Sequence, residues 1–444
     1  MGQEVAIHQG KPPGRPGSST PLDSGCIAPP ARAASGSLFF TATASLAAWA
    51  MTCVAAIGRR AQPRSARTPR RLFRLGAGAI AVLSSAPWGD SMAATVQLYG
   101  LIDTFVMYAR NDGDSNLRMG SDSGRLPANL SASDSFWGLL GVEDLGGGVR
   151  VQFRLEGGMR MNNGTQRYTG ALRPDGSRSA GTLFNREANI AVSSASWGTL
   201  KVGKQFPAVV SHTADPFFFS EAFSPAASAS QMVMDLGPGA ARIQVRVDDA
   251  ISYQTPSMNG LVIHALYAPQ QRRKLFAMNG DSANQPTEGD TGVLATYTSG
   301  QWVLGGSYNA LRSESLHGSF RTDLFVASTT YTTGALQSSI VYTLMRPKAP
   351  GTISAQIVAL NSLWQQGAHV LRGSLLYRAL NGRSDHTIGG LLGYDYELSK
   401  RSSVYTRAGG FKNTSRAFYG LGASLPTGMG VSSTVLALGI MHRF

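Results

Sequence analysis

The chain has 444 residues, of which 43% are hydrophobic and 52 are glycine, and its formal net charge is +14. This length suits two ordinary soluble domains or one large barrel. The basic excess is concentrated at the N-terminus, because residues 95–444 hold 30 basic and 23 acidic side chains, a balance of +7. Those basic residues are spread along the chain rather than clustered, which argues against nucleic-acid binding.

The N-terminal residues differ in composition from the rest of the chain. Residues 1–36 are rich in Pro, Gly, Ser and Ala without an apolar period, a composition typical of disordered segments. Residues 37–58 form an apolar stretch long enough to cross a bilayer as a helix. We interpret residues 1–69 as an extension upstream of the true translation start, so that the apolar stretch would not be made. A helical N-terminal anchor is the alternative.

Residues 70–94 have the three-part arrangement of a secretory signal peptide. Arginines precede a short apolar core, and small residues provide a cleavage site after Ala93 or Ala94. We therefore expect the mature protein to be a single domain over residues 95–444. Both cysteines of the chain precede this domain, so we expect it to contain no disulfide bond and no thiol chemistry.

The mature domain consists of short segments in which apolar and polar residues alternate. It contains no apolar run of 18 residues that could form a membrane helix. In VRVQFRLEGG (149–158), the apolar and the polar residues fall on opposite faces, the period-two pattern of a strand with different surroundings on its two sides. About sixteen such segments are predicted as strands: 95–108, 133–142, 148–159, 184–193, 198–205, 247–254, 259–267, 290–298, 301–309, 321–331, 335–344, 351–361, 366–379, 385–395, 401–411 and 432–444.

The connections between these segments alternate in length. Short turns follow even-numbered segments: EDLGGG (143–148), SSASWG (193–198), TPSMNG (255–260), TSGQ (298–301) and ELSK (397–400). Longer polar links follow most odd-numbered segments: 109–132, 160–183, 206–246, 268–289 and 412–431. Short turns at one edge, long loops at the other and an even number of strands are typical of a transmembrane β-barrel. A soluble sandwich, the alternative for any single segment, gives no reason for this segregation.

The last segment continues its alternation to the final residue. Its larger apolar residues share one face with Phe444, and small or polar residues occupy the other face. Chain ends usually fray unless they are tied down. In hydrocarbon every backbone polar group must be paired, so a spanning sheet has to close on itself. We therefore predict that segment 432–444 pairs with segment 95–108.

Several stretches, in order along the mature domain, carry recognisable motifs. They are TVQLYGLID (95–103), FWGLLGVEDLGGGVRVQFRLEGG (136–158), LFNREANIAV (183–192) with WGTLKVGKQ (197–205), DDAISYQTPSMNGL (248–261) and GIMHRF (439–444). Together they resemble the general diffusion porins of Gram-negative outer membranes, the sixteen-stranded trimeric type. The resemblance covers essentially all of residues 95–444.

The resemblance implies an all-β fold, a transmembrane antiparallel barrel of sixteen strands with short periplasmic turns, long extracellular loops and an inward-folded third loop. It implies a homotrimer in the outer membrane of a Gram-negative bacterium, in contact with lipid and lipopolysaccharide. In this family the terminal aromatic residue is read by the outer-membrane assembly machinery, which gives Phe444 the role of an assembly signal.

The resemblance also implies a constriction where the third long loop, residues 206–245, folds into the barrel. Asp215 and Glu221 are acidic residues of this loop that would face basic residues on the wall. A loop of this length without structure of its own is usually functional or disordered. Its PFFFSEAF stretch is too apolar for a loop in water, so we expect it to pack against the inner wall.

On the wall, the resemblance assigns Arg186 in LFNRE and Arg246 before DDAISY to the constriction, and Lys204 stands where the family usually has arginine. Alternation places Arg246 in a polar set. It places Arg186 in phase with Ala188 and other apolar residues, so the assignment of Arg186 rests on the resemblance alone. The family motif S-R-W/F-G is not conserved here, because Phe136 stands in place of the arginine. This departure weakens the expectation of strong anion selectivity.

The expected function is passive diffusion of ions and small hydrophilic solutes through a water-filled channel, with mild charge selectivity predicted to favour anions. A porin specific for small organic acids or sugars is an alternative, since loop phenylalanines could form a slide for them: Phe217, Phe218, Phe219 and Phe223. A rim enzyme or an adhesin is more distant, as G-x-S-x-G, H-E-x-x-H and G-x-x-x-x-G-K-[ST] patterns are absent from the sequence. We expect no catalytic residue, no cofactor, no metal and no nucleic-acid partner.

Overall fold

The computed structural model describes part of the chain, all of it within one compact unit, Ala86–Phe444. The described residues are 95–112, 114–120, 135–166, 183–210, 214–218, 220, 223–225, 233–269, 272–276, 282–286, 289–315, 318–421 and 428–444. The expected extension over 1–69 and signal peptide over 70–94 lie outside them. No helix among the described residues is long and apolar enough to cross a bilayer.

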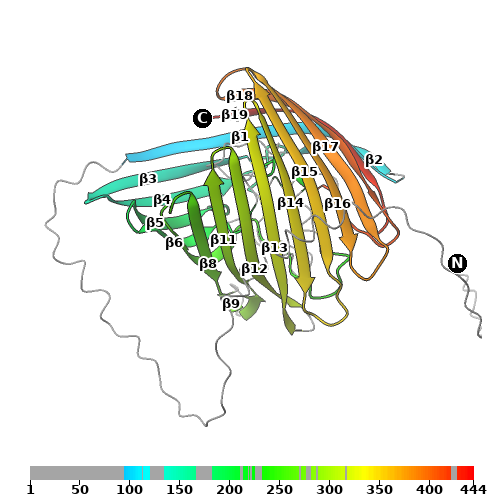
Figure 1. Ribbon diagram of the computed structural model, residues 1–444, viewed down its shortest axis with the longest axis horizontal. Helices are drawn as coiled ribbons and strands as arrows, with labels where there is room; N and C mark the ends of the chain where they lie inside the picture. Colours follow the sequence, from blue (N-terminus) through cyan, green and yellow to red (C-terminus); the bar gives the residue numbers. More distant parts are fainter. Residues whose placement is uncertain are drawn as a thin grey trace, which may run out of the picture. The chain divides into compact units, whose positions relative to one another are not determined.

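The described part of the chain is built from strands. They are β1 (Thr95–Asn111), β2 (Asp114–Gly120), β3 (Phe136–Gly146), β4 (Val149–Gly158), β5 (Ala188–Ser194), β6 (Gly198–Gln205), β7 (Val247–Gln254), β8 (Leu261–Ala268), β9 (Arg272–Phe276), β10 (Ser282–Pro286), β11 (Gly289–Ser299), β12 (Trp302–Ser315), β13 (Gly318–Thr333), β14 (Leu336–Pro347), β15 (Ala355–Gln366), β16 (His369–Leu380), β17 (His386–Glu397), β18 (Ser402–Asn413) and β19 (Ser433–Arg443). Figure 1 shows β11 to β17 running side by side at a common tilt.

All of these strands except β9 and β10, which form a hairpin of their own, belong to one antiparallel sheet that closes into a barrel. Consecutive strands pair from β3 to β8 and from β11 to β19. In addition, β8 pairs with β11, and β1 pairs with β19 from Leu101↔Arg443 to Asn111↔Ser433. The strands β2 and β3 both pair with β1, at Phe105–Asn111 and Thr95–Leu101 respectively, so they occupy one position of the barrel between them. The barrel therefore has sixteen positions. This confirms the predicted sixteen-stranded fold and the pairing of the last segment with the first.

Three short strands were not predicted. β2 lies in the link 109–132, and the β9–β10 hairpin lies in the link 268–289, both of which were predicted as loops. The sequence of β2, DSNLRMG, is mostly polar, and its pairing with β1 uses backbone groups. A pattern based on apolar alternation cannot detect such a strand, because neither of its faces is buried against an apolar surface.

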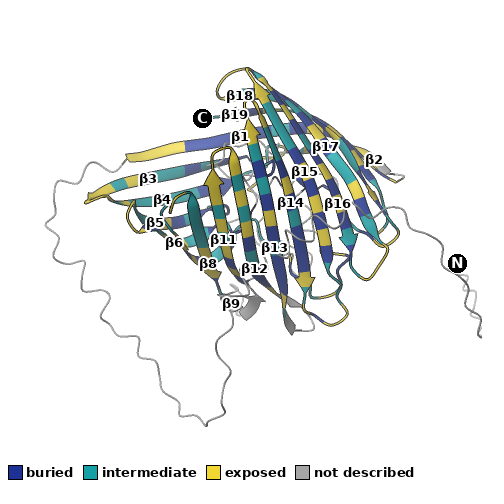
Figure 2. Cartoon of the chain, viewed as in Figure 1, coloured by how far each residue is buried: buried dark blue, intermediate teal, exposed yellow. Residues whose placement is uncertain are grey.

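Buried and exposed residues alternate along the strands, so the two faces of the barrel wall differ in exposure (Figure 2). On β19, Leu436, Leu438 and Ile440 are exposed on the outer face, Leu438 to 67%, while Val435 and Ala437 are buried on the inner face. Large apolar side chains that point outwards are stable only if the surroundings are apolar too. The outer face is therefore suited to hydrocarbon, and the closed sheet leaves no strand edge with unpaired backbone groups in it.

Exposed aromatic side chains mark both edges of this apolar outer face. Those near the short turns are Trp197, Tyr253, Tyr297, Trp302, Tyr396 and Phe444, and those near the long loops are Tyr108, Tyr267 and Tyr377. Aromatic girdles at the two membrane–water interfaces are characteristic of transmembrane barrels. The short turn between β3 and β4 is made by Gly146, Gly147 and Gly148, all with positive φ, a conformation that glycine adopts without steric cost.

Candidate pore constriction

The described residues of the long connection 206–245 contact the inside of the barrel wall. The Val210 N–H donates to the Ser307 hydroxyl oxygen at 3.2 Å, and the Ala214 carbonyl accepts from the Asn361 amide at 2.9 Å. Ser307 on β12 and Asn361 on β15 are both buried on the inner face. These contacts fix the first part of the loop against the inner faces of β12 to β15.

The apolar stretch of the loop packs against the inner wall. Phe217 and Phe223 are fully buried, and the ring of Phe223 meets that of Phe105 on β1 edge to face at 4.9 Å between centroids. The guanidinium of Arg407 on β18 lies 5.6 Å from the centre of the Phe217 ring. Rings held in this way serve as packing surfaces, and they are inaccessible to a passing solute.

Two buried ionic clusters hold the loop against this wall. In the first, Arg378 on β16 makes a bidentate pair with Asp235 of the loop, at 2.5 and 2.6 Å, and neither side chain is exposed. In the second, Asp395 on β17 accepts from Arg372 at 2.5 Å and from Arg407 at 2.7 Å. Arg372 also donates to the Pro216 carbonyl of the loop.

A second connection, between β18 and β19, reaches the same region. Its Phe418 N–H donates to Asp235 at 2.8 Å, and its Tyr419 hydroxyl donates to the Pro225 carbonyl of the loop at 2.6 Å. Tyr419 is completely buried, and this burial raises the pKa of its hydroxyl well above the ordinary value. The two connections therefore interlock over the inner face of β15–β19.

The opposite wall, formed by β3 to β7, carries a different arrangement of charges. Glu156 on β4 accepts from the Tyr99 hydroxyl at 2.8 Å and from the Arg186 Nε at 3.1 Å. The Arg186 guanidinium also lies 4.3 Å above the ring of Phe136. Phe136, which occupies the expected place of an arginine, thus supports another arginine of the wall.

A β-bulge explains why Arg186 points inward against the simple alternation. The Glu156 N–H donates to the Glu187 carbonyl at 2.7 Å, and the Arg186 N–H donates to the Glu156 carbonyl at 3.1 Å. Two residues of this segment therefore oppose one residue of β4, which is the arrangement of a bulge and redirects a side chain. Arg186 and Glu187 are both buried inside the barrel.

A second irregularity lies between β6 and β7. The register shifts between Gly203 and Gln205, and Asp249 has a φ of +54°. Lys204 beside this shift makes an ion pair with Asp248. The predicted alternation that grouped Arg246 with Asp248 is interrupted here.

Arg246 nevertheless reaches the same inner region. Its guanidinium stacks over the Phe206 ring at 4.5 Å and acts electrostatically on the Glu156 carboxylate. Arg186, Lys204 and Arg246 are thus brought to the wall that carries Glu156.

Of the two acidic residues expected on the loop side, Asp215 and Glu221, the structure describes only Asp215. The Asp215 carboxylate is buried and accepts from the Phe217 N–H at 2.9 Å and from the Ser224 hydroxyl, so it stabilises the local turn of the loop. Glu221 lies outside the described residues.

Phe444 closes the seam of the barrel. Its N–H donates to the Gly100 carbonyl at 3.2 Å, and its carbonyl accepts from the Gly100 N–H at 3.1 Å. A Cβ at Gly100 would collide with the Phe444 ring, so the glycine makes room for the aromatic side chain.

Several charged residues of the two inner walls are not among the candidates predicted from the sequence. The alternation of VRVQFRLEGG already placed Arg154 on the polar face of its strand, and Glu156 shares that face. The arginines that anchor the loop cannot be recognised from local alternation. Arg378, for example, pairs with Asp235, which is 143 residues away in the sequence. Within the described residues, no group of three or more His, Cys, Asp or Glu side chains could hold a metal ion.

Comparisons with known proteins agree with this architecture. An outer membrane porin protein of Bordetella pertussis is 28% identical and matches over 82% of this chain and 98% of its own length. Outer membrane porin protein 32 of Delftia acidovorans is 27% identical, with the same coverage. Among solved structures, an anion-selective porin from Comamonas acidovorans superimposes with a TM-score of 0.62 at 22% identity, covering 79% of this chain and all of that one.

The trimer form of OmpT, an outer membrane protein of Vibrio cholerae, has the same fold, with a TM-score of 0.55 at 15% identity over 80% of this chain and all of that one. The family model described as Gram-negative porin matches residues 75–416, well over half of the chain. A closed sixteen-stranded barrel with an apolar outer face and a charged inner wall is the structure such a family requires. The chain belongs to the Gram-negative porins, the channel proteins of the outer membrane.

Proposed function

We propose that this porin passes ions and small hydrophilic solutes passively, with a mild preference for anions that is set between loop 206–245 and the wall formed by β4–β7. The observation that carries the proposal is the charge of this wall. Its inner side gathers five basic and three acidic side chains: Arg154, Arg186, Lys201, Lys204 and Arg246 with Glu156, Glu187 and Asp248. The similarity to an anion-selective porin supports the same sign.

The mechanism is electrostatic. A narrow passage with a low-dielectric wall concentrates the field of the charges that line it, and the sign of their sum biases which ions enter. Arg186, Lys204 and Arg246 contribute to this field from the wall. Glu221 contributes from the loop, while Asp215 acts by holding the loop in shape, consistent with its buried carboxylate.

Reversal potentials in planar bilayers test the proposal. The purified protein is inserted into a planar bilayer and measured across a KCl gradient. Stepwise conductance with a chloride-favouring reversal potential is expected. Stepwise conductance with a potassium-favouring potential would contradict the sign, and a folded barrel without conductance would contradict the channel itself.

A porin specific for organic acids or sugars is the alternative that the same apparatus can test. Such a porin would show conductance that is blocked, with saturation, by its solute. The burial of Phe217 and Phe223 leaves them unable to form an aromatic slide, which favours general diffusion. We further infer that the barrel has no catalytic role.

We also propose that the protein is a homotrimer embedded in lipid and lipopolysaccharide, and that Phe444 is read by the outer-membrane assembly machinery. The trimer form of a relative with the same fold supports the first proposal. The exposure of Phe444 at the barrel seam supports the second. An SDS-resistant band at three times the monomer mass, converted by heating to the monomer, is expected. Deletion of Phe444 should reduce the amount of assembled barrel in the membrane.

We propose that the mature chain begins after Ala93 or Ala94. The proposal rests on the arginines, the short apolar core and the small residues of 70–94 in the sequence. The intact mass of the protein purified from outer membranes should correspond to residues 94–444 or 95–444. A mass that includes residues before 90 would contradict this cleavage.

A further inference from the structure

We infer that Arg154 and Lys201 are selectivity-determining residues of this pore, in addition to Arg186, Lys204 and Arg246. This inference rests on the proposed anion preference and names two residues that contribute to the excess of positive charge on the wall. Arg154 lies on β4 and Lys201 on β6, and both belong to the inner face. Neither residue is part of the constriction expected from the sequence.

The carboxylates near Arg154 are already occupied by other donors. Glu156 accepts from Tyr99 at one oxygen and from Arg186 at the other, at 2.8 and 3.1 Å. Glu187 accepts from the Asn189 amide at 3.0 Å. These hydrogen bonds to the two carboxylates are donated by groups other than Arg154.

Arg154 consequently keeps only loose ion pairs. Its guanidinium lies 3.8 Å from the nearest oxygen of Glu156 and 3.8 Å from that of Glu187, beyond hydrogen-bonding distance. Its side chain remains 18% exposed, whereas that of Arg186 is 1% exposed. Arg154 is therefore the arginine of this pair that a solute in the lumen can approach.

Lys201 occupies a similar position on the other side of Glu187. In the sheet register it stands opposite Ala191 on β5 and Ser252 on β7, both of which are buried on the inner face. Within the part of the chain that the structure describes, its ammonium makes no ion pair shorter than 4 Å, and it interacts at longer range with Glu187 and Arg154. Two cations thus share the influence of one carboxylate.

The result is a local excess of positive charge. Glu156 is hydrogen-bonded to Arg186, and Asp248 pairs with Lys204, whereas Arg154 and Lys201 share Glu187 and Arg154 has a further loose pair with Glu156. A small hydrated anion can complete the coordination of these two side chains as it passes. A loosely held charge suits this use, since conduction requires that an ion binds weakly enough to leave again.

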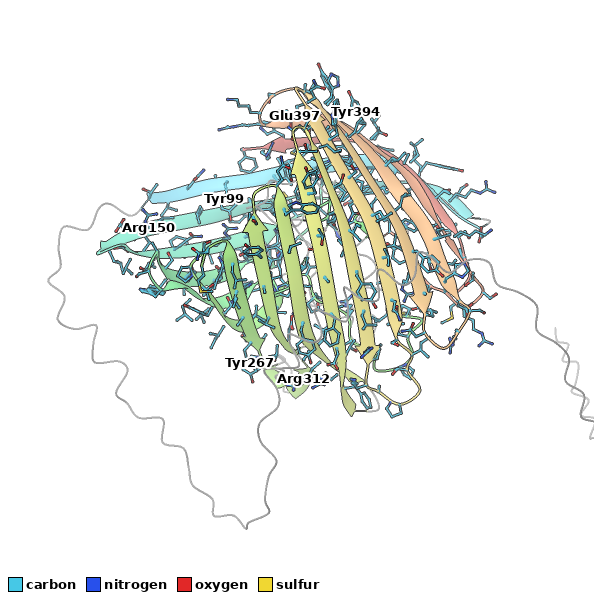
Figure 3. The ribbon with its side chains drawn as sticks, viewed as in Figure 1. Tyr99, Arg150, Tyr267, Arg312, Tyr394 and Glu397 are labelled. Carbon is cyan, nitrogen blue, oxygen red and sulfur yellow. The ribbon has the colours of Figure 1, made fainter. Side chains whose placement is uncertain are left out.

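The test compares matched charge removals on the protein as it is purified from outer membranes. Arg154→Gln and Lys201→Gln each remove one cation from the inner wall. Arg150→Gln is the control, because Arg150 lies on the same strand, is 66% exposed and pairs with Asp144 at 3.5 Å near the short turn (Figure 3). Heat modifiability on unboiled gels verifies that each variant is folded. Arg154→Lys keeps the charge and should keep the wild-type selectivity.

The readout is the chloride-to-potassium permeability ratio from the reversal potential in dilute KCl. Each inner-wall variant should lower this ratio about twofold, the effect of one unit charge at several ångströms in a water-filled passage, and the double variant should lower it about fourfold. Arg150→Gln should lower it less. Shifts no larger than that of Arg150→Gln, in a wild-type pore that favours chloride, would overturn the inference and leave the proposed function intact. A wild-type pore that favours potassium would instead contradict the proposed function.

Discussion

The two halves of the inner wall use the same residue types in opposite ways. On β16–β18 the arginines Arg372, Arg378 and Arg407 are buried beneath loop 206–245 and make short, closed ion pairs with Asp235 and Asp395. On β4–β6 the cations Arg154 and Lys201 are partly exposed and only loosely paired.

The difference shows what burial does to a charge. A fully buried ion pair acts as a structural clamp, since separating its members would leave an uncompensated charge in a poorly polarisable environment. A partly solvated charge in a narrow passage contributes little to stability but acts on every ion that enters. We therefore propose that the first wall shapes the pore and that the second sets its selectivity.

The largest expected effect comes from removing one half of a buried clamp. Arg378→Met leaves the Asp235 carboxylate buried without its bidentate partner, which should destabilise the barrel by about 3–5 kcal/mol. The measurement is the midpoint of urea unfolding in detergent. The double variant Arg378→Met with Asp235→Leu should recover most of the loss, and a single variant as stable as wild type would show that the pair is not a clamp.

A smaller effect is expected at the shared carboxylate of the same wall. Arg407→Met removes one donor from Asp395 but leaves Arg372 in place, so the cost should be about 1–3 kcal/mol. Because Phe217 also loses its cation, the loop should be held less firmly, and single-channel current noise should increase. Equal noise in the variant and the wild type would argue that Phe217 packing alone positions the loop.

Changing the salt concentration should distinguish the charges of the two walls without any mutation. Raising KCl from about 0.1 to 1 M shortens the screening length from about 10 to 3 Å, which weakens charges reached through water and hardly affects buried pairs. The chloride-to-potassium permeability ratio should approach that of a pore without charge selectivity. The midpoint of urea unfolding should change little. A selectivity that persists at 1 M would indicate that buried or very close charges determine it.

The smallest effect is expected when a compensated pair is removed as a unit. Glu156→Gln combined with Arg186→Gln deletes one negative and one positive charge, so the permeability ratio should change by clearly less than the roughly twofold expected for a single charge. Glu156→Gln alone should raise the preference for chloride, because it removes only the negative charge. A large shift in the double variant would mean that the pair does not neutralise itself.

The strands and their closure could be predicted because they depend on local alternation and on a general requirement of the membrane. The segment ending at Phe444 shows this, since its alternation and the need for closure together identified its partner strand. Alternation also predicts that Arg154 lies on the polar face of its strand.

Other features depend on geometry that alternation does not encode. The bulge opposite Glu156 turns the Arg186 side chain inward, whereas simple alternation along the strand assigns it to the outer face. The clamp between Arg378 and Asp235 joins a strand to a loop that is distant in sequence. The strand β2 pairs through its backbone and carries little apolar pattern. In each case the information lies in the three-dimensional arrangement rather than in a local period.

The most direct test of the account is a liposome-swelling experiment with solutes of similar size and different charge. Glucuronate, glucose and glucosamine differ mainly in being anionic, neutral and cationic at neutral pH. All three should enter liposomes containing the purified porin, and glucuronate should enter faster than glucosamine in dilute buffer. Swelling no faster than that of protein-free liposomes, or faster entry of glucosamine, would contradict it.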